Sequence, residues 1–202
     1  METTPTADPR AVTAGPAYVW SRAALVIGLL AILPGGVAIL AASLPGGDFG
    51  LLVVASVLWL PVGLAWIAAL VASRGQRHAL GRPQRSFALA PAVVVLTVAL
   101  AISGLPLTAR FAISRSALER LPDLGLSNDE SASVGLYSVC CFERTDFGYR
   151  FGVSQGLNVV WGFAYSPNGP PAGPDIDSGL REGDNAYRHL DGPWYIWELL
   201  VT

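Results

Sequence analysis

Three long stretches of the chain contain no ionisable residue. They are Ala23–Gly47, Phe49–Ser73 and Ser86–Ala109. A helix needs about 20 apolar residues to cross a hydrocarbon core of about 30 Å, where it satisfies its own backbone groups. The pattern therefore predicts a membrane region at residues 23–112. Its transmembrane helices are expected at about 23–45, 49–73 and 87–109.

The first stretch has a second interpretation, as the core of a cleaved signal peptide. Arg10 and Arg22 precede it, and three small residues at 41–43 lie near its end. However, the apolar run is longer than the 7–15 residues typical of a signal core. This length favours a retained span that follows a tail of residues 1–22.

An amphipathic segment follows the third stretch. The run SRSALERLPDL, residues 114–124, predicts a short helix at the start of a domain of residues 113–202. Ser116 and Glu119 have the spacing of a capping box, and Arg115 and Glu119 have that of an i,i+4 ion pair. We expect this helix to carry the chain past the membrane interface.

From residue 134 onward the hydrophobic period becomes two, which is typical of strands. In GYRFGVSQ (148–155) and LNVVWGFAYS (157–166), bulky residues alternate with small or polar ones. The runs VGLYSVCCF (134–142) and PWYIWELLV (193–201) predict two further strands. The predicted fold class is membrane α plus β-rich: three transmembrane helices followed by a small antiparallel β domain.

The run GFAYSPNGPP, residues 162–171, predicts the end of a strand and a turn. Pro167 sets φ, and Asn168 and Gly169 tolerate a positive φ. An irregular, acidic stretch is expected to follow, up to Tyr187. The alternative is a proline-rich docking motif in polyproline II form. No basic cluster adjoins the prolines, and the turn is favoured.

The placement of arginines predicts the orientation of the spans. The link at residues 74–85 carries four arginines, whereas the link at 44–50 carries none. Short cytoplasmic loops carry an excess of basic residues. We therefore expect a cytoplasmic N-terminus and an extracytoplasmic domain at residues 113–202, in the plasma membrane. The arginines that oppose this count are Arg110, Arg115 and Arg120.

Composition supports a membrane protein and separates two regions by charge. Charged residues make up only 14% of the chain, against about 25% in soluble domains. Residues 1–112 hold seven arginines and three acids, a net charge of +4, whereas residues 113–202 hold six arginines and twelve acids, a net charge of −6. The total of −2 gives no basic excess, and we expect no nucleic-acid partner.

The predicted spans lack the groups that ion and proton pathways use. Ionisable residues inside a membrane usually mark such pathways, and the three stretches contain none. The pattern favours helices that anchor the protein in the bilayer over a self-contained pump or a proton-coupled transporter.

Cys140 and Cys141 are the only cysteines and the only candidate site residues. In a regular strand they would point to opposite faces. Neighbouring Cα atoms also lie about 3.8 Å apart, below the usual disulfide range of about 4.4–6.8 Å. Three interpretations remain open: two free thiols, a vicinal disulfide that requires a distorted backbone, or an intermolecular bridge.

No catalytic, cofactor-binding or metal site is predicted, and we expect no enzyme. His189 is the only histidine beyond the spans, and it has no local signature of a Cys–His nucleophile. The run that starts at Asp175 begins like a calcium loop, but its sixth and twelfth positions are Leu180 and Ala186. The spacing typical of a zinc site is also missing.

One resemblance supports the compartment. GFAYSPNGPP, followed by YRHLDGPWYIWE (187–198), resembles the C-terminal segment of small actinobacterial membrane proteins that carry no assigned function. The resemblance covers about 40 residues. It implies a C-terminal extracytoplasmic domain, and it implies no catalytic or binding residues.

Together these patterns predict a membrane-anchored module that interacts with the cell envelope. Its expected partners are the lipid bilayer and an envelope protein or glycan. The alternative is an accessory subunit of a larger membrane transport or secretion complex. An envelope hydrolase is disfavoured, because no nucleophile, base and orienting group can be assembled from the sequence.

Overall fold

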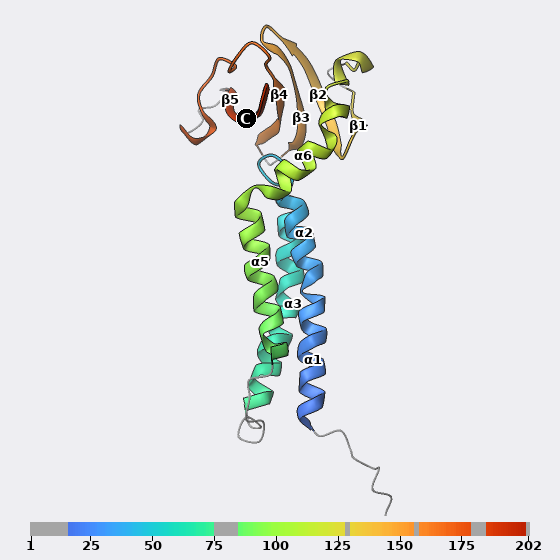
Figure 1. Cartoon of the computed structure of the whole chain (residues 1–202), viewed down its shortest axis with the longest axis vertical. Helices are drawn as coiled ribbons and strands as arrows, with labels where there is room; N and C mark the ends of the chain where they lie inside the picture. Colours follow the sequence, from blue (N-terminus) through green and yellow to red (C-terminus); the bar gives the residue numbers. More distant parts are fainter. Residues whose placement is uncertain (1–15, 75–84, 128–129, 156–157, 179–184, 201–202) are drawn as a thin grey trace, which may run out of the picture. The chain divides into compact units, whose positions relative to one another are not determined.

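The computed structural model describes residues 16–74, 85–127, 130–155, 158–178 and 185–200. Within those ranges, apolar helices are followed by an antiparallel sheet (Figure 1). The chain divides into two compact units, one of residues 1–35 and 56–96 and the other of residues 36–55 and 97–202. Most of the predicted N-terminal tail and most of the arginine-rich link lie outside the described residues.

The apolar part of the chain is helical. Its segments are α1 (Pro16–Leu30), α2 (Ile32–Ala42), α3 (Phe49–Arg74), the 3-10 helix η1 (Arg85–Ala88) and α5 (Leu89–Ser103). The stretches long and apolar enough to cross a membrane are Arg22–Ala42, Phe49–Arg74 and Ser86–Ser103. The prediction of three helices able to span a membrane is therefore confirmed by length and composition.

Two residues fix local features of the first two spans. Pro34 has no amide hydrogen to donate to the Leu30 carbonyl, and the helix is interrupted at Ala31, between α1 and α2. Asp48 caps the start of α3, because its carboxylate accepts a hydrogen bond from the Leu51 amide at 2.8 Å. The acid between the first two spans thus has a structural role.

The third span ends at Ser103, whereas the predicted end is residue 109. Gly104 takes a left-handed conformation (φ 68°), and Pro106 lies in the first turn of a new helix, α6 (Leu105–Leu118). A glycine of positive φ ends a helix, and proline is tolerated in the first turn of the next. The predicted boundary is wrong because hydropathy does not register this break inside an apolar run. The first span likewise ends earlier, at Ala42.

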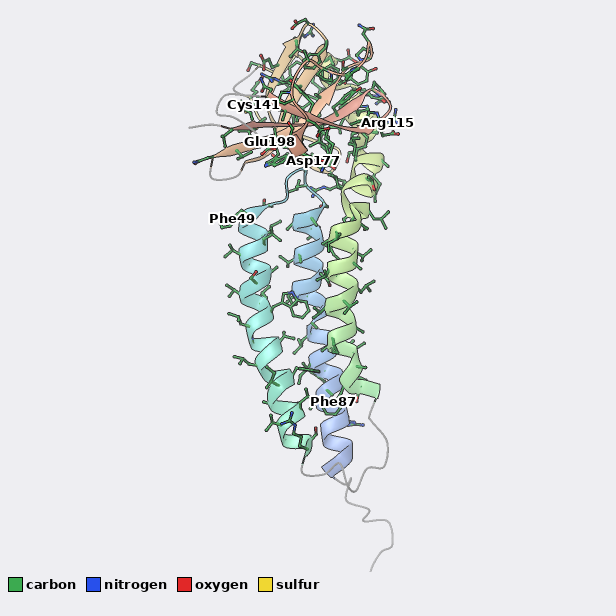
Figure 2. The ribbon with its side chains drawn as sticks, turned by 90° about the vertical axis from the view of Figure 1, so that its left-hand side faces the viewer. Phe49, Phe87, Arg115, Cys141, Asp177 and Glu198 are labelled. Carbon is green, nitrogen blue, oxygen red and sulfur yellow. The ribbon has the colours of Figure 1, made fainter. Side chains whose placement is uncertain are left out.

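The helices of the first unit pack closely at two points. A Cβ atom added to Gly28 would lie 2.6 Å from Leu89 Cδ2, so the helix backbone approaches that side chain closely. The Trp66 indole donates a hydrogen bond to the Phe87 carbonyl at 3.2 Å. Many other apolar side chains of α3 point outward, and Leu64 is 68% exposed (Figure 2). Such a surface suits a helix surrounded by lipid.

Six strands of the second unit form one antiparallel sheet in the order β1-β2-β3-β4-β6-β5. Their bounds are β1 (Ala132–Val134), β2 (Tyr137–Thr145), β3 (Gly148–Gln155), β4 (Val159–Tyr165), β5 (Asn185–Asp191) and β6 (Trp194–Leu200). The sequence predicts strands at the positions of β3, β4 and β6, and the structure confirms these three predictions. The sequence pattern does not predict β5. It places the first residues of this strand in the irregular stretch that ends at Tyr187.

The run at 134–142 is a hairpin rather than the single strand predicted for it. Gly135 is left-handed (φ 60°), and the Leu136 amide donates a hydrogen bond to Ser114 Oγ of α6 at 3.0 Å. A Cβ atom on Gly135 would lie 2.7 Å from Ser114 Cβ, so glycine fits here and larger residues do not. The prediction is wrong because a contact with a distant helix turns the chain.

The helix α6 begins earlier than the helix predicted at 114–124. Ser116 therefore lies inside it, and the predicted capping box with Glu119 is not formed. The predicted ion pair is present, with 3.0 Å between Arg115 Nε and Glu119 Oε1. Arg115 also pairs with Asp191 of β5 at 2.6 Å, which connects the helix to the sheet.

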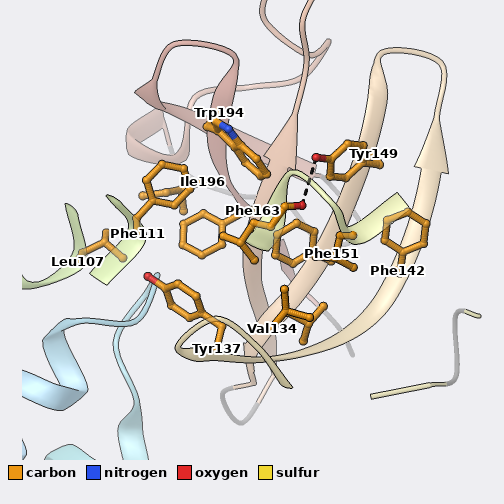
Figure 3. Packing of buried hydrophobic residues seen from close by; sticks show 13 residues of the cluster. Leu107, Phe111, Val134, Tyr137, Phe142, Tyr149, Phe151, Phe163, Trp194 and Ile196 are labelled. Atoms are coloured by element: carbon orange, nitrogen blue, oxygen red, sulfur yellow. Dashed lines mark hydrogen bonds between the residues drawn. The ribbon is translucent and has the colours of Figure 1, made fainter. Parts of the chain in front are cut away.

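One face of the sheet and α6 enclose an aromatic core, which we call the main core (Figure 3). Its buried members are Leu107, Phe111, Leu118, Leu121, Val134, Tyr137, Val139, Phe142, Tyr149, Phe151, Phe163, Trp194 and Ile196. Leu107, Phe111 and Leu118 come from one side of α6, at helical spacing. Because Phe163 and Trp194 are 0% exposed, this core is the main source of the domain's stability.

The link between the first two spans is built into the same domain. Leu44 packs against the main core, and Pro45 is fully buried. The ring of Trp161 lies only 2.2 Å from where a Cβ atom of Gly46 would stand, so the link backbone lies directly against that ring. The link and the sheet therefore belong to one folded unit.

Arg110 of α6 joins the link to the sheet. It donates hydrogen bonds to Ser43 Oγ at 2.8 Å and to the carbonyl of Leu136, from Nε at 3.1 Å. Its guanidinium carbon also lies 4.7 Å from the centre of the Tyr137 ring. Arg110, which follows the third span, is thus held by partners in the folded domain.

Replacing Arg110 by alanine should lower the domain's free energy of unfolding by about 2 kcal/mol, since hydrogen bonds to a charged group contribute about 1.5–3 kcal/mol each. Urea unfolding of the detergent-solubilised protein, followed by tryptophan fluorescence, measures the change. The matched control is Arg188→Ala, at an exposed arginine of β5. Equal midpoints for the two variants would contradict this role of Arg110.

The other face of the sheet carries a smaller second cluster. Its buried members are Ala164, Tyr187, Tyr195 and Trp197. Beyond β4 the predicted turn is present, because Gly169 has a φ of 124° and its carbonyl accepts a hydrogen bond from the Ser166 hydroxyl. The chain then continues through η3 (Ile176–Ser178), and the Tyr187 amide donates to the Pro174 carbonyl at 3.0 Å. This stretch therefore lies beside β5, and Ile176 packs against the main core.

Candidate functional site

The two cysteines lie side by side on β2. Their sulfur atoms are 3.0 Å apart, with both thiols free. Cys141 is exposed and Cys140 is half-buried. The expectation that the two side chains point to opposite faces is wrong, because a regular strand would hold the sulfurs much farther apart.

A β-bulge explains this geometry. The register between β2 and β3 shifts between Cys140 and Glu143, and Cys141 has a φ of +56°. Cys141 is the only non-glycine residue with a positive φ in the described parts of the chain. Opposite Cys140 stands Gly152, where a Cβ atom would lie 3.0 Å from the Cys140 sulfur. The missing side chain of Gly152 leaves the space that this sulfur occupies.

The environment of Cys140 suppresses its ionisation. Burial, and secondarily the hydrogen bond with Cys141, raise the pKa of the Cys140 thiol to about 11. Cys140 is therefore protonated at neutral pH, and the exposed Cys141 is the sulfur that solutes can reach.

The fold does not bring His189 to the cysteines. In the sheet order, β5 is separated from β2 by three other strands, which corresponds to about 19 Å at the usual strand spacing of about 4.8 Å. His189 Nε2 instead lies 2.9 Å from the Gly192 carbonyl oxygen, and the imidazole ring packs edge-on against Tyr195. The arrangement therefore supplies no base for a cysteine nucleophile from this histidine.

The acidic run that starts at Asp175 is partly described. Asp175 Oδ1 accepts a hydrogen bond from the Asp177 amide at 3.0 Å, which is a local turn interaction. Residues 179–184, including Leu180, lie outside the described residues. Among the residues that the structure describes, no three His, Cys, Asp or Glu side chains gather closely enough to hold a metal ion.

A shallow depression of about 180 Å³ opens at the side of the main core. Its walls include Pro122, Phe142, Arg144, Tyr149, Tyr165 and Pro167. The rings of Tyr149 and Tyr165 stack at 5.1 Å between centres, and Arg144 is exposed at the rim. Small-molecule and cofactor pockets usually measure about 300–1,000 Å³, so this depression is smaller than the usual site of a cofactor.

Arg150, on the opposite face, is occupied by structural contacts. It pairs with Glu143 at 2.7 Å, and its guanidinium carbon lies 4.9 Å from the ring centre of Trp197. It also donates to the Tyr187 hydroxyl at 3.4 Å. The side chain is only 15% exposed. These contacts make Arg150 part of the second cluster rather than a free anion-binding group.

Buried tyrosines make the domain sensitive to alkali. Burial raises the pKa of Tyr137 and Tyr149 far above the ordinary value of 10.0, and Arg110 only partly opposes the effect at Tyr137. The unfolded chain releases these protons from about pH 10 upward, whereas the folded chain retains them. The stability that depends on the neutral hydroxyls is therefore complete below pH 10 and is lost as the pH rises above it.

We expect the urea midpoint of the solubilised protein to be lower at about pH 11 than at about pH 8, with a smaller drop for Tyr149→Phe, which has one fewer titrating hydroxyl. Tryptophan fluorescence reports the midpoint. Equal midpoints at the two pH values would show that the tyrosines do not limit stability.

Comparisons with known proteins leave the site to be judged on its own geometry. No protein-family model, curated protein or solved structure matches the chain. The resemblance of residues 162–198 to small actinobacterial membrane proteins therefore stays a prediction.

Sequence reasoning identified the cysteines but missed the depression. Phe142, Tyr149 and Tyr165 lie in three separately predicted strands. Their convergence depends on the pairing of β2, β3 and β4, which places them together. The linear pattern carries no signal for that convergence.

Proposed function

We propose that this protein is a membrane-anchored interaction module whose C-terminal sheet domain lies outside the cytoplasm and binds an envelope partner, a protein or a glycan. The observation that carries the proposal is the contrast between the side chains of the spans and those of the sheet domain. The spans contain no ionisable residue, whereas the sheet domain carries an open depression walled by aromatic rings with an arginine at its rim.

The depression supports recognition of a partner rather than catalysis. Its aromatic walls offer apolar contact area. Arg144 Nη2 donates a hydrogen bond to the Pro122 carbonyl at 3.4 Å, and the other N–H groups of this side chain can donate charge-assisted hydrogen bonds to a carboxylate or hydroxyl. No nucleophile and base converge there among the described residues. The domain therefore has the features of a small binding surface.

Two observations support the orientation. The link 74–85 carries the dense arginines expected of a cytoplasmic loop. The link at residues 44–50 carries no arginine, and its Leu44 packs with the core of the sheet. Arg110 and Arg115, which oppose the arginine count, are engaged by partners within the domain.

A crosslinking experiment in intact cells tests the binding role. A photoactivatable residue placed at Pro167, which is exposed and lines the depression, gives a single defined reporter. We expect a discrete crosslinked product that weakens several-fold in Arg144→Gln and not in the control Arg188→Gln. A product that both variants form equally, or no product in any of them, would contradict binding at the depression.

The alternative, an accessory subunit of a larger membrane complex, is favoured by the broad apolar surface of α3, where Leu64 and Leu60 are 68% and 65% exposed. Truncation after Ser103 removes α6 together with the sheet and leaves the spans. Co-purification in mild detergent then separates the two functions. A large complex that survives the truncation supports the subunit, and one that requires the domain supports the binding module.

A further inference from the structure

We propose that Cys140 and Cys141 form a redox-active vicinal pair, which is converted to a disulfide by exchange with a low-molecular-weight disulfide. The site is independent of the proposed binding function. It requires only that the bulge of β2 be folded.

The backbone prepares the pair for closure. A trans peptide in a regular strand directs neighbouring side chains to opposite faces, whereas the positive φ of Cys141 turns its side chain toward that of Cys140. The resulting 3.0 Å between the sulfurs is shorter than an ordinary non-bonded contact between two sulfur atoms. A non-glycine residue in this conformation is a strained feature of the kind found at functional sites.

The opposite strand makes room for the pair. Gly152 stands across from Cys140. A Cβ atom added to Gly152 would also meet a methyl group of Val160. Any larger residue at Gly152 would push the Cys140 sulfur away. The position of the sulfur is thus set by β2 and β3 together, and not by the cysteine pair alone.

The exposures of the two sulfurs assign their order of reaction. The Cys141 thiolate, formed by loss of its proton to water, attacks one sulfur of the solute disulfide. That disulfide bond breaks, and the first thiolate leaves and takes up a proton. The Cys140 sulfur then attacks the Cys141 sulfur in the mixed disulfide, and the second solute thiolate leaves with the proton of Cys140. Two protein thiols are oxidised, and one solute disulfide is reduced to two thiols.

Other fates of the pair find less support. A metal site would need further ligands, and none gathers around the sulfurs among the described residues. An intermolecular bridge would use the exposed Cys141 alone, whereas Cys140 already lies 3.0 Å from it. The arrangement favours ring closure within the chain.

The test uses the full-length protein in detergent, reduced and then treated with excess 5,5′-dithiobis(2-nitrobenzoate). The wild type should release both equivalents of the coloured thiolate, retain no adduct and have an intact mass two units below the reduced form. Cys140→Ser and Cys141→Ser, whose folding is checked by circular dichroism, cannot close a ring. Cys140→Ser should keep a stable adduct on Cys141, and Cys141→Ser should react far more slowly.

Denatured protein provides the matched control. In concentrated guanidinium chloride the bulge is lost, and the wild type should mainly retain adducts on its sulfurs. A folded wild type that keeps two adducts, or that forms disulfide-linked dimers, would overturn the proposal. Equal closure in the folded and denatured states would show that the fold does not build the site.

Discussion

Replacing Trp194 by alanine is expected to unfold the sheet domain. The side chain is 0% exposed and lies at the centre of the main core. Its ring contacts those of Phe111, Tyr149, Phe151 and Tyr165 at 5.1–6.2 Å between centres. Deleting a fully buried aromatic side chain costs about 3–5 kcal/mol, which is a large fraction of the total stability of a domain of this size.

The loss of Trp194 should affect the domain and spare the spans. We expect the variant to remain in the membrane fraction, because insertion depends on the apolar helices. Protease added to the detergent-solubilised protein should cleave the region beyond α6 much faster than in the wild type. Leu124→Ala, at a residue that is 56% exposed, is the control and should change stability by less than about 0.5 kcal/mol. Protease resistance equal to that of the wild type would show that the main core does not hold the domain together.

A single methyl group at Gly162 should also be strongly destabilising. A Cβ atom there would lie 1.9 Å from the Phe151 carbonyl oxygen and 2.5 Å from Trp197 Nε1. Those two groups form a buried hydrogen bond of 2.9 Å, which the methyl group would break. Overpacking costs about 1–3 kcal/mol and the lost hydrogen bond about 1 kcal/mol, so we expect a loss of about 3 kcal/mol.

Gly125→Ala is the matched control for Gly162→Ala. Gly125 has a φ of +63°, but no atom lies within 4 Å of where its Cβ would be. Alanine there adds only backbone strain of about 1–2 kcal/mol. Urea midpoints measured by tryptophan fluorescence should fall further for Gly162→Ala than for Gly125→Ala. The reverse order would mean that β3, β4 and β6 leave room for a methyl group at Gly162.

The spans and the strongest strands could be predicted because their signals are local. Apolar runs identified the three helices, and the alternation around Phe163 identified β4 with its core-facing side. The end of the third span could not be predicted in the same way. Gly104 and Pro106 break the helix inside a run that stays apolar, and a hydropathy pattern does not distinguish a break from a continuation.

The features that the sequence missed depend on contacts between distant residues. β5 contains the adjacent polar residues Arg188 and His189, which interrupt the alternation, and its pairing with β6 defines it as a strand. The turn at Gly135 forms against Ser114, and Leu44 enters the core from between two spans.

The residues of the candidate site could be predicted from the sequence, but their geometry could not. Cys140 and Cys141 stand out in the sequence as an adjacent pair, but their placement on one side follows from a bulge opposite Gly152. A bulge changes the register of one strand relative to its neighbour, and a single run of residues does not record that change. The depression beside Tyr149 and Tyr165 likewise exists only after β2, β3 and β4 have paired.

The most direct test of the central claim is a pair of reporters fused after Thr202. With three spans and a cytoplasmic N-terminus, we expect alkaline phosphatase at this position to be active, because the enzyme folds only outside the cytoplasm. A green fluorescent protein at the same position should be dark, and one inserted at Gly81, in the arginine-rich link, should fluoresce. An inactive phosphatase with a fluorescent protein that glows after Thr202 would place the sheet domain in the cytoplasm and contradict the account.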